Sequence, residues 1–142
     1  MNNFSGLCKN IYTKPHDLPN DFNILYLLNK YSLSYIYYDD FNLIKIDISN
    51  LDIHFDIIKR FLKILVFEAQ YRYIEKNAIV LEISEKDLIL NEFLVLLDIM
   101  KLTKTLHYFK IKIKKEADII SDKQILEALN HIKSKYIGLN IK

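Results

Sequence analysis

Carboxylates and histidines are the side chains of this sequence that could do chemistry, so their spacing comes first. Asp39 and Asp40 are adjacent in a short polar segment, an arrangement in which a hairpin turn can hold metal ions. A two-metal site needs more ligands than one pair of carboxylates supplies. Because Asp is also an ordinary turn residue, we interpret the pair as part of a turn.

The histidines do not have the spacing of metal ligands; they are His16, His54, His107 and His131. His54 lies between Asp52 and Asp56 at the expected start of a helix, where acidic residues interact favourably with the helix dipole. His107 lies on the apolar side of an expected strand, which indicates a structural role. No nucleophile stands beside a base, so the sequence indicates a non-enzymatic protein with no catalytic residue, metal ligand or cofactor.

Composition excludes several other kinds of site. The chain has two glycines among 142 residues, so it cannot contain the Gly-rich loops that bind phosphates. Cys8 is the single cysteine, which excludes an internal disulfide bond and a cysteine-based metal site. A formal net charge of +2, from 20 basic and 18 acidic residues, is too balanced to indicate nucleic-acid binding by itself.

Length and hydropathy predict one folded domain. A chain of 142 residues, 51% of them apolar, can bury a full core, which favours folding over disorder. Residues 1–19 contain both prolines and are expected to form an irregular arm, followed by a single α/β domain at residues 20–142. No apolar run is as long as a membrane span and no secretory signal is visible, so we expect a cytoplasmic protein.

The segment of residues 77–115 predicts a strand, a helix and a second strand. The apolar run at residues 79–83 is typical of a strand that is covered on both faces. Ser84 and Asp87 have the spacing of a capping box, which would open a helix. Its apolar face would comprise Ile89, Phe93, Leu96, Leu97 and Met100. Apolar and basic residues then alternate over residues 107–113, as in a strand, and we expect a right-handed crossover between the two strands.

Similar patterns predict the remaining elements. A first helix is expected at about residues 21–31, before a β-hairpin of residues 33–38 and 43–48. A long helix at about residues 52–76 would carry an apolar stripe of Ile57, Ile58, Phe61, Leu62, Leu65 and Ala69. Ser121 and Gln124 form a capping box for the last helix, with Gly138 placed as its C-terminal cap. The expected core includes Ile46, Ile58, Phe61, Leu65, Val80, Leu81, Phe93, Leu97, Ile111 and Leu129.

A basic stripe marks the last expected strand; it consists of Lys110, Lys112, Lys114 and Lys115. Such a stripe could contact the phosphates of a nucleic acid or the surface of an acidic partner. The same lysines would also serve as a solvated face, or would protect the edge of a sheet from aggregation. Because the net charge is small, we favour the second interpretation and keep the first as an alternative function.

Three segments resemble the STAS domain, the fold of the anti-sigma-factor antagonists and of the cytoplasmic tails of transporters. The similar segments are LSYIYYDDFNLIKIDISNLD, as the opening hairpin, IVLEISEKDLILNEFLVLLDIM, as the central strand, loop and helix, and HYFKIKI, as the next strand. The resemblance covers roughly residues 33–136. It implies a mixed sheet flanked by helices, ordered as a β-hairpin and then α-β-α-β-α, here with an extra N-terminal helix.

The chain departs from the STAS pattern at the phospho-acceptor motif, which is typically Asp-Ser-Ser/Thr-Gly. The matching positions read Leu90, Asn91, Glu92 and Phe93, so the acceptor hydroxyl is replaced by an amide that cannot be phosphorylated. The resemblance therefore implies a regulatory interaction or scaffold module that lacks a phosphoswitch. Its partner would be a protein, and a homo-oligomer is a further possibility.

The expected docking surface is the loop that leaves the central strand, because such loops carry function more often than the scaffold does. It comprises Glu85, Asp87, Leu88, Leu90, Asn91 and Glu92. Exposure of Leu88 or Leu90 beside the two glutamates would have the anatomy of a protein contact. The alternative is that both leucines pack inward, since buried leucine is the commoner state.

Overall fold

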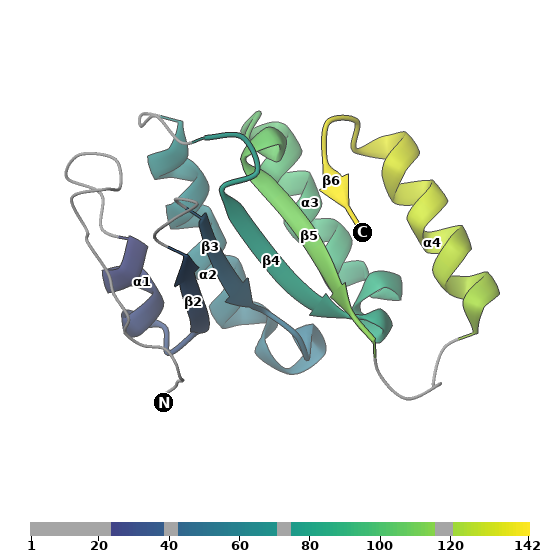
Figure 1. The fold of residues 1–142 in the computed structure, drawn as a ribbon, viewed down its shortest axis with the longest axis horizontal. Helices are drawn as coiled ribbons and strands as arrows, with labels where there is room; N and C mark the ends of the chain where they lie inside the picture. Colours follow the sequence, from purple (N-terminus) through teal and green to yellow (C-terminus); the bar gives the residue numbers. More distant parts are fainter. Residues whose placement is uncertain (1–23, 39–42, 71–74, 116–120) are drawn as a thin grey trace.

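The computed structural model of this chain describes residues 24–38, 43–70, 75–115 and 121–142. Within these residues five strands form one mixed sheet, in the order β2-β3-β4-β5-β6 (Figure 1). The strands are β2 (Ser34–Tyr38), β3 (Leu43–Asp47), β4 (Ile79–Ser84), β5 (Phe109–Lys114) and β6 (Asn140–Ile141). The β2 and β3 strands are antiparallel and in register from Ser34↔Asp47 to Tyr38↔Leu43, which confirms the predicted hairpin. All other pairs are parallel.

In the described part of the chain four α-helices accompany the sheet, as expected for a single α/β domain; they are α1 (Ile24–Lys30), α2 (Leu51–Ala69), α3 (Asn91–Leu102) and α4 (Asp122–Lys135). Each crossover from β3 to β6 moves one place in the same direction along the sheet. Crossovers of one hand then place their helices on one face, and Figure 1 shows α2 and α3 together behind the strands. The C-terminal end of α4 is held against α3 by Tyr136, whose hydroxyl donates to Asp98 Oδ1 over 2.6 Å.

The two faces of the sheet differ in chemistry. Side chains on the helix-covered face form the core with the helices; examples are Ile46, Leu81 and Ile111. The opposite face carries charged residues, such as Lys45, Glu82 and Lys112. Five of the six β4 residues are buried, on both faces of the strand, and the described helices lie on one of these faces.

Val80 shows the consequence for β4. It is only 5% exposed, yet it lies outside the main core cluster because it points to the charged face. Its neighbours in register are Lys45 and Lys110, whose methylene stems can cover apolar surface. Eight other predicted core residues are buried in the main cluster, as predicted, and Leu129 packs against it half-buried; the eight are Ile46, Ile58, Phe61, Leu65, Leu81, Phe93, Leu97 and Ile111.

Two local predictions need correction. The Ser84–Asp87 capping box forms, but it opens a short 3₁₀ helix, η3 (Glu85–Ile89), and α3 begins only at Asn91 because Leu90 is extended. Ile89 is therefore outside the apolar face of α3 and is 48% exposed. His107 belongs to a second 3₁₀ helix, η4 (Leu106–Tyr108), and is exposed, so it does not lie on the apolar face of a strand.

The ends of two other elements also differ from expectation. The long helix α2 ends at Ala69 rather than near residue 76. The C-cap of α4 is Tyr136, and Gly138 follows it in the left-handed region at φ +102°, which glycine adopts without steric cost. The short strand β6, which pairs with β5, was not predicted, since two residues are too few to show a period.

We expect Leu81→Ala to reduce the free energy of unfolding by about 2–5 kcal/mol, because it removes a fully packed side chain from the central strand. Leu102→Ala provides the control, since Leu102 is almost fully exposed and its loss should cost less than about 0.5 kcal/mol. Urea unfolding of both variants measures the difference. Equal effects would contradict the assignment of β4 to the centre of the core.

Candidate functional site

The parallel strands β3, β4 and β5 end at the same edge of the sheet, and polar residues gather there. Asp47 ends β3, Ser84 ends β4 and Lys114 ends β5. Figure 1 shows the three arrowheads directed to one side of the molecule, toward the start of α2. In open α/β sheets this carboxyl edge is the usual place for binding sites.

Asp87 joins two elements at this edge. Its Oδ2 atom accepts hydrogen bonds from the backbone N–H of Ser84 (2.9 Å) and from the Ser84 hydroxyl (2.8 Å). Its Oδ1 atom accepts a bond from the backbone N–H of Leu51 (3.1 Å), the first residue of α2. Asp87 is 0% exposed, so one buried carboxylate connects the β4–α3 loop to the start of the longest helix.

The position of Asp87 also suits the electrostatics of α2. The residue before the helix, Asn50, is in the left-handed region at φ 60° and its side chain forms no cap. The amino end of a helix has unpaired N–H groups and a partial positive charge, both of which favour a carboxylate. Asp87 therefore serves as a long-range cap for α2, a role that its capping-box spacing did not reveal.

The residues of the expected docking surface differ in how deeply the structure buries them. Asp87 and Leu88 are buried, and Leu90 is half-buried against the core. The alternative of inward packing is thus confirmed for Leu88. Glu85 and Glu92 are half-buried and Asn91 is exposed, so the exposed apolar side chain among these acidic residues is Ile89, which was not among the predicted site residues.

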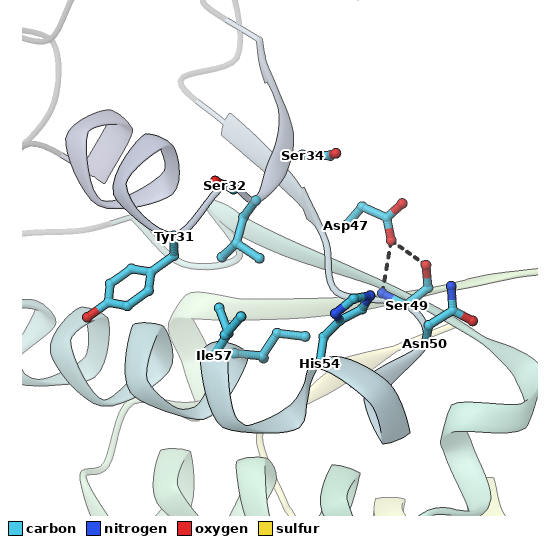
Figure 2. Close-up of a pocket in the computed structure, with 10 residues that line it drawn as sticks. Tyr31, Ser32, Ser34, Asp47, Ser49, Asn50, His54 and Ile57 are labelled. Atoms are coloured by element: carbon cyan, nitrogen blue, oxygen red, sulfur yellow. Dashed lines mark hydrogen bonds between the residues drawn. The ribbon is translucent and has the colours of Figure 1, made fainter.

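A groove of about 360 Å³ opens beside the end of β3. Its walls come from the α1–β2 turn, the end of β3 and the start of α2; the lining residues are Tyr31, Ser32, Leu33, Ser34, Asp47, Ser49, Asn50, His54, Ile57 and Ile58. Figure 2 shows Ser32 and Ser34 on one side of the groove, across from Ile57 and His54. Ser32 (φ 56°) and Asn50 (φ 60°) are both left-handed, a strained conformation that often accompanies functional sites.

Asp47 and Ser49, which line this groove, form a hydrogen-bonded group with Lys114. The Asp47 Oδ1 atom accepts from the backbone N–H (2.9 Å) and the hydroxyl (2.6 Å) of Ser49. Lys114 Nζ donates to Asp47 Oδ2 over 3.3 Å and to Ser49 Oγ over 3.1 Å. Burial alone would raise the pKa of Asp47, but the bonds from Ser49 and the charge of Lys114 outweigh it and lower that pKa.

This arrangement determines what chemistry the groove can do. Both oxygens of Asp47 are engaged within the network, one by Ser49 and the other by Lys114. The hydroxyls, the amide of Asn50 and the imidazole of His54 can instead form hydrogen bonds with a polar molecule. The groove was missed in the sequence because its residues come from three separate segments, and the polar run after β3 was the only local signal.

The basic stripe is partly neutralised by carboxylates. Glu82 lies between two lysines, with Oε2 at 3.7 Å from Lys45 Nζ and 4.0 Å from Lys112 Nζ. Lys114 pairs with Asp47. Among the described residues, Lys110 and Lys115 therefore remain as the lysines of the stripe without an ion-pair partner.

The other candidate residues do not converge. His54, His107 and His131 lie on α2, η4 and α4 and are all exposed. Within the described ranges no group of three or more His, Cys, Asp or Glu residues could hold a metal ion. Asp39, Asp40, His16 and Cys8 lie outside the described residues. None of the described helices combines the length and the apolar character that crossing a bilayer requires.

Comparisons with protein families, with characterised proteins and with solved structures found no match to this chain.

We expect Asp87→Ala to reduce the free energy of unfolding by about 2–4 kcal/mol, because it leaves three buried donors without an acceptor. Ser84→Ala removes one of these donors together with its bond and should cost about 1 kcal/mol. Glu85→Ala is the neighbouring control and should change the stability by less than about 0.5 kcal/mol. Urea unfolding measures all three; a loss below about 1 kcal/mol in Asp87→Ala would contradict the long-range cap.

The Asp47 network predicts a pH-dependent stability. Since folding lowers the pKa of Asp47, its contribution is present above the unfolded pKa, about 3.9, and is lost as the pH falls through the folded value. Wild type should therefore be more stable than Asp47→Asn at neutral pH, and the difference should disappear in acid. Unfolding measured from about pH 7 to pH 2 tests this. A difference that is the same at every pH would contradict the network.

Proposed function

We propose that this chain is a non-enzymatic protein-interaction module of the STAS type, regulatory and without a phosphoswitch. Its contact surface is the segment of residues 85–92, referred to below as the edge loop. One observation supports this proposal above the others. The buried Asp87 holds the edge loop in place while Ile89, at 48% exposure, projects from it.

The order of the described elements is consistent with this proposal. A hairpin precedes α2, β4, α3, β5 and α4, which is the order from which the STAS interpretation starts. Asn91 takes the place of the phospho-acceptor and is exposed at the first residue of α3. An amide there forms hydrogen bonds but accepts no phosphate, so binding would be constitutive.

The chemistry around the edge loop favours a basic and apolar partner segment. Glu85 and Glu92 are partly exposed beside Ile89. The α4 helix packs against η3 beside this loop. Apolar side chains with a charged rim are typical of protein contacts. A partner peptide with one large apolar residue between lysines or arginines would complement them.

The basic stripe favours nucleic-acid binding less. Four free lysines would give a slope near −3.6 in a plot of log affinity against log salt on duplex DNA, whereas two would give about −1.8. Because Lys112 and Lys114 already face carboxylates, we expect the smaller slope or no measurable binding. A salt titration with mixed-sequence duplex distinguishes this alternative from the edge-loop proposal.

The edge-loop proposal predicts a selective loss of binding. Ile89→Asp and Glu92→Lys should each abolish copurification of the protein partner from the native host without changing the free energy of unfolding by more than about 0.5 kcal/mol. Ile137→Asp is the matched control, because Ile137 is 82% exposed in the turn before β6 and far along the chain from the edge loop. This control should retain the partner.

Two outcomes would contradict the proposal. If Ile89→Asp retains every partner that wild type binds, the contact surface is elsewhere. If Ile137→Asp loses the partner while Ile89→Asp retains it, the turn before β6 is the surface instead.

A further inference from the structure

The α2 helix has a second apolar stripe on its solvent side. Its buried side is formed by residues such as Ile58, Phe61 and Leu65. Away from that side Ile53 is 72% exposed, and Ile57, which also lines the groove, is 43% exposed. Arg60, exposed, and Ile64, which is half-buried and also packs against the core, continue this row of positions. Single exposed apolar residues are common, but a row of them along one helix indicates a surface that another molecule covers.

The spacing of the stripe specifies what kind of surface would cover it. Its members follow one another at intervals of four, three and four residues. This is the a/d pattern of a coiled coil, in which a second helix packs along the first. Arg60 fits such a seam, since its stem is apolar and its guanidinium can reach the solvent. The occupant is therefore expected to be a helix.

The charges beside the stripe identify which helix. Asp56 and Lys63 are both exposed, lie on the same flank of the stripe and are one heptad apart. They take part in none of the ion pairs between described residues. A second copy of α2 in the antiparallel direction would place Asp56 opposite Lys63 of that copy. By symmetry the same pair forms twice.

The apolar residues agree with the same alignment. Antiparallel pairing that places Ile53 opposite Ile64 of the second copy also places Ile57 opposite Arg60. In this alignment Asp56 is level with residue 61 of the second copy, so Lys63 of that copy lies two residues further along, a rise of about 3 Å. Long side chains span this distance. Parallel pairing would instead place Arg60 against Arg60, which repels.

We propose that two copies of this chain associate through the solvent side of α2 as an antiparallel helix pair. The contact extends over residues 53–64, about 18 Å of helix. Such a contact is at the small end of specific interfaces, so the dimer should have a dissociation constant in the micromolar range. The inference does not depend on the edge-loop proposal, because it uses a different helix and different residues.

Charge reversal provides the test, measured by sedimentation equilibrium over a concentration series. Asp56→Lys and Lys63→Asp each turn both attractive pairs into repulsive ones, so each variant should dimerise at least about tenfold more weakly than wild type. An equimolar mixture of the two variants should dimerise again, because one copy then has only lysines and the other only aspartates at these positions. The double variant Asp56→Lys/Lys63→Asp should also regain the affinity of wild type.

Matched controls separate this geometry from a general effect of charge. Asp122→Lys and Lys133→Asp make the same changes of charge on α4, where both residues are exposed, and should leave the dimer unchanged. Circular dichroism of every variant confirms that it is folded. A monomeric wild type at several hundred micromolar, single variants that dimerise like wild type, or a mixture that stays monomeric would each overturn the proposal.

Discussion

The arrangement of this protein depends on one buried carboxylate. Asp87 accepts three hydrogen bonds, two from Ser84 and one from the first N–H of α2. Water cannot replace these bonds at a 0% exposed site, so the loop after β4 and the start of α2 hold a fixed relation. That relation positions two parts of the molecule: the edge loop, which contains Asp87, and α2, on whose outer side we propose that a second helix packs.

The direction in which the chain winds explains the chemistry of the other sheet face. Each successive strand joins on the same side, so the crossover helices gather on one face and the described elements leave the other to charged residues. Glu82 of the central strand lies between Lys45 and Lys112 there. Partly exposed ion pairs of this kind contribute little to stability. Their effect is to make one face of the sheet polar, and they neutralise Lys112 of the basic stripe in doing so.

The parts of the fold that could be predicted are those in which a period repeats several times. Strand β3 of the hairpin and the buried side of α3 show such periods, and Ile46, Phe93 and Leu97 were identified correctly as core residues. Errors arose where one local bond broke the pattern, as at His107, where the N–H of Tyr108 donates to Thr105 and starts a 3₁₀ turn before β5. The hydrogen bond from Leu51 to Asp87 joins residues 36 positions apart in the sequence, and the groove is lined by residues from three separate segments. Neither feature produces a periodic sequence pattern that could have predicted it.

The α2 helix shows that the apolar residues of one helix need not all belong to one buried stripe. Ile57 and Ile58 were assigned to the same buried stripe, but adjacent residues on a helix point about 100° apart, and only Ile58 faces the core. Once the buried residues are removed from the pattern, the remaining isoleucines fall at heptad spacing with opposite charges at their flank. A helix with more apolar residues than its buried face can hold therefore indicates a second contact surface. The structure is needed to decide which apolar residues belong to which face.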